Sequence, residues 1–380
     1  MKAFPVSDLQ AGRYFTKAVY LDDKYILLTP ETQLTDSLLE RLRAWEYATV
    51  LSDGESVTNP VLSSDDDGAS VSLSVDQDVK EQTLFHEAET FFNELLGFVE
   101  RIFTDFVTKG EVAQRPIGEQ VKQIIDMTRS HRRYLLRLGE MTVKDKNYIV
   151  NHSTKTAVVS IAIGTTLRLP SHKLIELGTA AMLHEIGMIR LPPQLYMSQK
   201  QLSGKERQAI AAHTVLGFKI LKQESFPVSV SLAVLECREN HDGTGYPRKL
   251  AGDKISLYAK IIRVAGSFAA MISERPFRAA LEGHAAILEM LQQSGKHYDE
   301  SVLKALIANV SLYPIGTYVQ LSNGTRGMVV DTNVDNPRAP KVRVIAGPQG
   351  ERYAEQPVVD TGIDTTHTVV RAIASPVAKN

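Results

Sequence analysis

The spacing of apolar residues changes several times along the chain, and each change predicts a different kind of structure. In residues 1–53, short alternating runs predict strands, with a hairpin turn at 22–24 and one helix at 36–45. Residues 54–79 are rich in Ser, Asp and Gly, a composition typical of an extended acidic linker. We therefore expect a small α+β domain, with a regulatory or docking role, followed by a linker.

A wide apolar stripe follows in residues 80–116, where apolar side chains recur every three or four positions. This spacing predicts one long connecting helix whose stripe needs a partner. Two interpretations stay open. The stripe is the core of the following domain, or it pairs with a second copy of itself in a homodimer.

The next stretch, residues 117–310, carries helical spacing almost throughout, with segments bounded by Gly, Pro or Ser. The expected helices are 117–138, 148–167, 173–186, 203–224, 227–239, 257–273, 281–294 and 300–310. Residues 311–380 return to short alternating runs, with strands expected at 318–321, 326–330 and 341–345. The predicted fold class is mainly α, a helical bundle with a small N-terminal α+β domain and a small C-terminal β cap.

Bulk composition narrows the classes of function. The chain has 380 residues, 43% of them hydrophobic and 23% charged, which is typical of a globular protein. A net charge of −1 gives no general attraction to nucleic acid, so phosphate recognition would need a local cluster of cations. No apolar run approaches the roughly 20 residues of a membrane span, and residues 1–7 lack the apolar region of a signal peptide. With the single Cys237, these features indicate a cytoplasmic protein.

One polar loop between two apolar helices collects candidate binding residues. Its six residues are Asp242, Gly243, Thr244, Gly245, Tyr246 and Pro247. The two glycines permit positive φ and the proline stops a helix, so a loop is expected here, held on a rigid helical scaffold. Three histidines precede it at wide spacing, His152, His184 and His213. On different helices of a bundle, such histidines can face one pocket.

The order of these histidines, the loop and the sequence Arg-Pro-Phe-Arg at 275–278 resembles the HD-GYP family of bacterial signalling phosphohydrolases. The similarity covers residues 145–280, with a weaker match to 345. It implies an HD-type bundle that hydrolyses cyclic di-GMP with two or three bound ions, usually iron or manganese. The resemblance also implies a set of residual metal ligands and two arginines that contact the cyclic dinucleotide. These are His152, His184, Glu185 and His213, and Arg275 and Arg278.

Several positions depart from the family pattern. The Asp of its His-Asp pair is Glu185, its adjacent pair of histidines is Cys237-Arg238, and its later metal-binding Asp is Gly266. One ion keeps three ligands, whereas the second keeps two and faces the guanidinium of Arg238. We therefore expect no tightly bound cofactor, and iron or manganese if any ion is held. Arg238 has three interpretations: it pairs with Glu185, it grips a phosphate oxygen, or it points to solvent.

Two functional interpretations follow from this resemblance. The first is a degenerate HD-GYP signalling protein of the cyclic di-GMP network. It lacks phosphodiesterase turnover and binds the nucleotide, or a partner such as a diguanylate cyclase domain, with Arg238, Arg275 and Arg278 as ligand-binding residues. In this interpretation the Gly-Tyr-Pro loop is a protein-contact surface. The alternative is an active metal-dependent cyclic di-GMP phosphodiesterase with an altered metal site.

Overall fold

The structure is a computed structural model of the whole chain. It describes residues 2–373 except 18, 23–24, 29–33, 37–38, 40–41, 44–47, 59–68, 140, 142–146, 197–202, 275–279, 334–335, 354–355 and 365. The chain divides into two compact units, Met1–Lys80 and Glu81–Asn380. Each unit is described by itself.

The first unit is built on a four-stranded antiparallel sheet. Its order is β1 (Lys2–Pro5), β5 (Thr49–Ser52), β3 (Val19–Asp22) and β4 (Tyr25–Leu28). A 3₁₀ turn, η1 (Val6–Asp8), follows β1, and β2 (Tyr14–Phe15) pairs with β6 (Ser56–Val57). The pairing of β3 with β4 confirms the predicted hairpin, while much of the predicted helix at 36–45 lies outside the described residues. The small core of this unit includes Phe15, Leu42 and Val50.

The boundaries of the predicted linker differ from the structure at both ends. Strand β6 extends the first unit beyond residue 53, and the long helix α2 (Ala69–Lys109) begins well before residue 80. The helix starts directly after Gly68, and residues 69–80 contain neither Gly nor Pro that would stop it. Residues 59–68 of the predicted linker lie outside the described residues.

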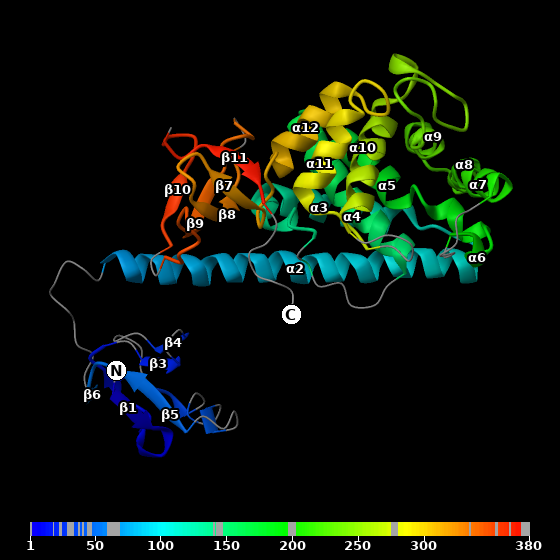
Figure 1. Ribbon diagram of the computed structural model, residues 1–380. Coiled ribbons are helices and arrows are strands. Elements are labelled where there is room, and N and C mark those ends of the chain that lie inside the picture. The colour runs from blue at the N-terminus through cyan, green and yellow to red at the C-terminus, as the bar shows by residue number, and fades with distance from the viewer. Residues whose placement is uncertain are drawn as a thin grey trace. The chain divides into compact units, whose positions relative to one another are not determined.

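The apolar stripe of α2 packs into the core of its own chain. Phe92, Leu95 and Val99 are completely buried and belong to the same hydrophobic cluster as the bundle helices. Figure 1 shows α2 running along one side of the bundle. Because one chain already covers this stripe, the homodimer interpretation is wrong for it, and the domain-core interpretation holds.

The second unit is a helical bundle around α4 (Figure 1). Its helices are α3 (Gln114–Leu135), α4 (Tyr148–Thr166), α5 (Ser171–Leu183), η2 (Ile186–Arg190), α6 (Pro193–Tyr196), α7 (Gly204–Ala211), α8 (His213–Gln223), α9 (Val228–Glu236), η3 (Gly252–Lys254), α10 (Leu257–Met271), α11 (Gly283–Gln292) and α12 (Glu300–Val310). Helix α4 is buried on nearly all sides because α3, α5, α10 and α12 pack around it.

The predicted helices are confirmed apart from their ends and one break. The segment expected at 203–224 is two helices, α7 and α8, divided at Ala212. Side-chain caps explain two helix starts. Ser203 caps α7 in a capping box with Glu206, and the Asp299 carboxylate accepts backbone N–H groups at the start of α12.

The C-terminal segment is a five-stranded antiparallel sheet with a small core of its own. The strand order is β10 (Val358–Asp360), β9 (Lys341–Ala346), β8 (Arg326–Asp331), β7 (Tyr318–Leu321) and β11 (Val369–Ala372). Three of these strands were predicted, and β10 and β11 were not. Arg133 of α3 fastens the sheet to the bundle, because its guanidinium donates to the Val330 carbonyl and lies 3.4 Å from Asp331 Oδ1.

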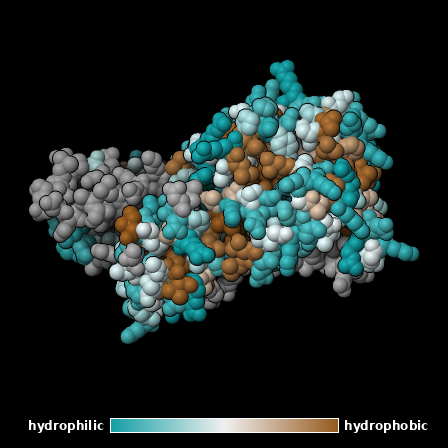
Figure 2. Space-filling model, turned by 90° about the horizontal axis from the view of Figure 1, so that it is seen from above, coloured by the Kyte–Doolittle hydropathy of each residue, from teal (hydrophilic) through white to brown (hydrophobic). Residues whose placement is uncertain are grey.

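Within the described residues, no helix combines the length and apolar character that a membrane span requires. Figure 2 shows hydrophilic residues over much of the face in view, with hydrophobic residues in separate patches between them. A mixed surface of this kind is ordinary for a folded domain.

Candidate metal and anion site

The four residues predicted as metal ligands meet inside the bundle. His152 lies in the second turn of α4, His184 follows the last residue of α5, Glu185 precedes η2, and His213 is the first residue of α8. All four are buried, with at most 3% of each residue exposed. They converge because α4 packs against α5, and η2 packs against α8.

Glu185 lies at the centre of this group. Its Oε1 atom is 3.4 Å from His184 Nε2 and 3.7 Å from His152 Nε2. Its Oε2 atom is 3.6 Å from His213 Nε2. One carboxylate therefore faces three imidazoles, two on one oxygen and the third on the other.

Backbone contacts fix the tautomers of two of these histidines. Nδ1 of His184 lies 2.7 Å from the Ala181 carbonyl, and Nδ1 of His213 lies 2.7 Å from the Ile210 carbonyl. A carbonyl only accepts, so each Nδ1 carries the proton and each Nε2 turns a lone pair toward Glu185. Burial lowers the pKa of His184 to about 4 and also lowers the pKa of His213, which keeps both rings neutral at pH 7.

Arg238 supplies the positive charge that this arrangement needs. Its Nη2 donates to Oε1 of Glu185, and its side chain is 22% exposed. Burial alone would raise the pKa of Glu185, but the positive charge of Arg238 beside it outweighs burial, and the pKa lies well below its usual range. Burial would likewise lower the pKa of Arg238, and Glu185 raises it. The predicted pairing of Arg238 with Glu185 is therefore present, and the solvent-directed interpretation is wrong.

The backbone of the Gly-Tyr-Pro loop packs against the backbone of Arg238. A Cβ added to Gly245 would lie 2.6 Å from the Arg238 carbonyl oxygen, so the loop backbone approaches closer than any side chain allows. The Tyr246 amide donates to the same carbonyl at 3.2 Å, and the Tyr246 ring lies edge-on to His213. The outer part of the loop is held by Asp242, which accepts from the Thr244 amide and hydroxyl. The loop thus belongs to the wall of the site, in addition to any surface role.

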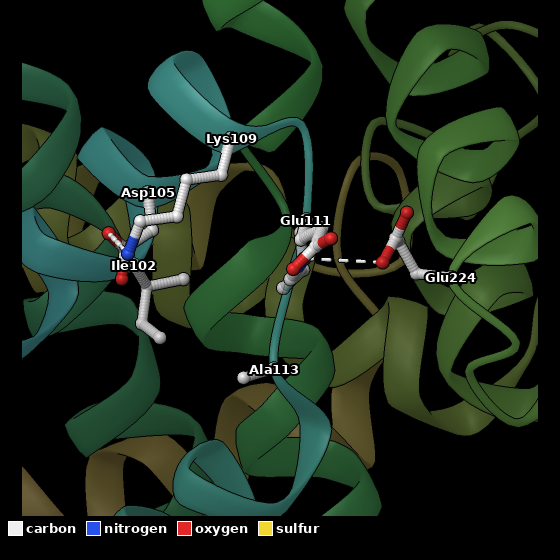
Figure 3. Close-up of a pocket in the computed structure, with 7 residues that line it drawn as sticks. Ile102, Asp105, Lys109, Glu111, Ala113 and Glu224 are labelled. Carbon is white, nitrogen blue, oxygen red and sulfur yellow. Dashed lines mark hydrogen bonds and ion pairs between the residues drawn. The ribbon is translucent and has the colours of Figure 1, made fainter.

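A pocket of about 250 Å³ lies at another place, where α2 meets the chain leading into α3 (Figure 3). Its ionisable groups are already used within the chain. Lys109 pairs with Asp105 at 2.8 Å, and Glu224 accepts the Val112 amide at 3.2 Å. None of the predicted site residues lines this pocket.

Comparison with known proteins identifies the fold of the bundle. The family described as HD domain matches residues 137–302. The cyclic di-GMP phosphodiesterase PdeB of Borreliella burgdorferi is 31% identical over 199 residues, 52% of this chain and 52% of its own length. The cyclic di-GMP phosphodiesterase PA4108 of Pseudomonas aeruginosa is 31% identical over 248 residues, 64% of this chain and 59% of its own length. Residues 137–302 of the chain thus match an HD domain, and the chain is similar to these two cyclic di-GMP phosphodiesterases.

The chain spans between half and three fifths of the length of these two curated relatives. Among solved structures, Bd1817, an HDG"Y"P protein from Bdellovibrio bacteriovorus, aligns with a TM-score of 0.48 and 15% identity. That alignment covers 80% of this chain and 97% of the other.

The donor set of the described residues could hold one metal ion but does not fit two. Donor atoms of His152, His184 and Glu185 all lie within 4.8 Å of one another, and two imidazoles with a carboxylate suit iron or manganese. A second ion would find His213 and the shared Glu185, beside the guanidinium. A Cβ added to Gly266 would lie 3.8 Å from His152 Cε1, so this position faces the site but brings no carboxylate to it.

Cys237 does not restore the lost ligands. Helix α9 ends at Glu236, so Cys237 and His241 do not share a helix face. Burial raises the pKa of the Cys237 thiol to about 12, which keeps it protonated, and His241 Nδ1 lies 3.8 Å from Asp299.

The candidate residues from the sequence did not include the buried Lys155 on α4 or the half-buried Arg263 on α10. A charged residue inside an otherwise apolar helix was the signal that could have found Lys155. Arg275 and Arg278, which were expected to contact the ligand, lie outside the described residues.

Proposed function

We propose that this protein is a degenerate HD-GYP module of cyclic di-GMP signalling. It binds the nucleotide or a partner protein, such as a diguanylate cyclase domain, and does not hydrolyse cyclic di-GMP. The contact between Arg238 and Glu185 carries this proposal, because the guanidinium takes the carboxylate oxygen that faces both His152 and His184. A guanidinium balances charge, but it does not acidify a water molecule as a bound metal does.

Electrostatics supports the loss of a two-metal site. At an effective dielectric constant of about 20, a divalent ion about 4 Å from a guanidinium is repelled by roughly 8 kcal/mol. Attraction to protein ligands would offset little of this repulsion, because the second ion would have His213 and the shared Glu185 as its remaining ligands. Gly266 supplies no third donor.

The proposed ligand contacts are Arg238 from the described site and, on the ground of the family resemblance, Arg275 and Arg278. These arginines provide fixed positive charge for a phosphodiester. Without an activated water, bound cyclic di-GMP would be released intact. Binding of the nucleotide would then change the contacts that the protein makes with its partner.

Metal content and turnover test this proposal directly. Protein purified from iron- or manganese-rich medium should carry less than about one tightly held ion per chain and should leave cyclic di-GMP intact. The matched variant combines Cys237→His, Arg238→His and Gly266→Asp, and its metal content should rise. Two ions per wild-type chain together with turnover would establish the alternative, an active phosphodiesterase. That alternative draws its support from the cluster of His152, His184 and Glu185.

Binding is measured separately by calorimetry in the presence of a chelator. Cyclic di-GMP should bind without metal, and more weakly as salt is added. Arg238→Ala should cost about 1.5–3 kcal/mol, the range for a hydrogen bond to a charged group. Absence of binding by the wild type would remove the nucleotide from the proposal and leave the protein partner, which co-purification with a diguanylate cyclase domain would then test.

A further inference from the structure

Lys155 is a buried cation with an unusual environment. The residue is 4% exposed, and its Nζ donates to the Ser273 hydroxyl at 3.0 Å. In the part of the chain that the structure describes, it makes no ion pair with a carboxylate. Burial lowers the pKa of Lys155 to about 8, so the amine is still largely protonated at pH 7. A buried charge with one neutral partner is costly, and such groups usually have a function.

The position of Lys155 connects it with the candidate site. It follows His152 by three residues on α4, so both side chains lie on neighbouring parts of one helix face. On α10, Gly266 lies against His152 and Thr156, and Ser273 lies just after the C-terminal end of the same helix, which ends at Met271. The contact between Lys155 and Ser273 and the contact between His152 and Gly266 therefore lie along one seam between α4 and α10.

The charges around this seam do not balance. Arg238 is neutralised by Glu185, whereas Arg263 has neutral partners. Its guanidinium donates to Asn240 Oδ1 at 2.9 and 3.0 Å and to the Ser267 hydroxyl at 2.8 Å. Among the described residues, the buried Lys155 and the half-buried Arg263 thus carry positive charge that no carboxylate pairs with and that an anion would neutralise.

We propose that Lys155 is an anion-binding residue, whose ammonium group donates to a non-bridging oxygen of a phosphodiester bound at the seam between α4 and α10. The inference rests on the proposed nucleotide-binding function and adds a contact to it. Arg263 is not assigned this role, because its guanidinium already has hydrogen-bond partners and stacks on Tyr298. Lys155 has one hydroxyl partner, which leaves two of its three N–H donors for a ligand.

Calorimetry of the full chain with cyclic di-GMP at pH 7, in a chelator, tests the role of Lys155. Lys155→Met, which keeps the length and removes the charge, should raise Kd about ten- to hundredfold. Ser273→Ala removes only the neutral partner and should change Kd by less than about threefold. Lys173→Met removes an exposed lysine of α5 and should leave Kd unchanged. Circular dichroism of each variant establishes that it is folded.

A second probe, inorganic pyrophosphate, separates failure of this inference from failure of the proposed function. If wild type binds cyclic di-GMP and Lys155→Met binds it equally well, the inference is overturned and the proposed function stands. If only pyrophosphate binds, and Lys155→Met abolishes its binding, the anion site stands while cyclic di-GMP is excluded as its ligand. If neither probe binds to wild type, both the anion site and nucleotide binding are overturned.

Discussion

Replacing Lys155 by methionine should make the folded protein more stable at pH 7. The pKa of this lysine falls from 10.5 to about 8 on folding because of burial. At about 1.4 kcal/mol for each pKa unit, the buried charge costs about 3 kcal/mol of the free energy of unfolding. Methionine is of similar length and uncharged, and it loses the hydrogen bond to Ser273, worth about 1 kcal/mol. The expected net gain is about 2 kcal/mol.

The sign of the pH dependence provides the sharper test. Because the folded pKa lies below the unfolded value, the unfolded chain binds more protons between about pH 8 and 10.5. Wild type therefore gains stability from this group as pH rises through that window, and the advantage of Lys155→Met shrinks. By about pH 9.5 the buried-charge cost has fallen to roughly 1 kcal/mol, and the two proteins should be nearly equal in stability.

Urea denaturation followed by far-ultraviolet circular dichroism measures this difference, because the signal comes mainly from the helical second unit. The control is Lys173→Met, an exposed lysine whose loss should change the free energy of unfolding by less than about 0.5 kcal/mol at either pH. A Lys155→Met protein that is less stable than wild type at pH 7, or an advantage that does not change with pH, would refute the buried-charge reasoning.

Two further predictions concern packing. Gly187→Ala should lower the free energy of unfolding by more than about 3 kcal/mol, because the new Cβ would lie 2.0 Å from the His213 carbonyl oxygen. Gly204→Ala is the control, because its Cβ would meet nothing within 4 Å, and it should be nearly neutral. Equal denaturation midpoints for the two variants would contradict this prediction. Val99→Asp should unfold the second unit instead of producing a soluble monomer, because Val99 is 0% exposed. Glu100→Lys is the control on the exposed face of the same helix and should leave the protein folded. Light scattering and circular dichroism measure both variants, and a folded Val99→Asp monomer would support the dimer interpretation.

Local sequence signals predicted most elements, and tertiary contacts explain where they failed. The helix at 300–310 and the strand at 318–321 agree with α12 and β7 because caps, turns and periodicity act locally. The break at Ala212 has no Gly or Pro to announce it. It places the His213 backbone against Gly187, a contact between segments that no local pattern records.

The site shows the same division between local and tertiary information. Order and spacing predicted that His152, His184 and His213 would face one pocket, and the structure brings their Nε2 atoms around Glu185. The partner of Arg238 stayed open because its long side chain can reach several groups. Lys155 was missed because hydrophobic periodicity assigns its helix to the core as a whole and does not single out the one core position that carries a charge.

The pair of Arg238 and Glu185 also bears on the proposal that this site binds a ligand without hydrolysing it. If a histidine had become Arg238 without a nearby carboxylate, the helix end would hold an unbalanced cation. If Glu185 had kept its charge without ions or Arg238, a buried anion would lack its partner, a change that costs about 3–5 kcal/mol. Glu185 has one methylene more than the aspartate of the family pattern, and its Oε1 accepts from Arg238 while Oε2 faces His213. The charges of Arg238 and Glu185 thus complement each other. This supports binding without hydrolysis, because Lys155 and Arg263 then remain as charge that an anionic ligand can neutralise.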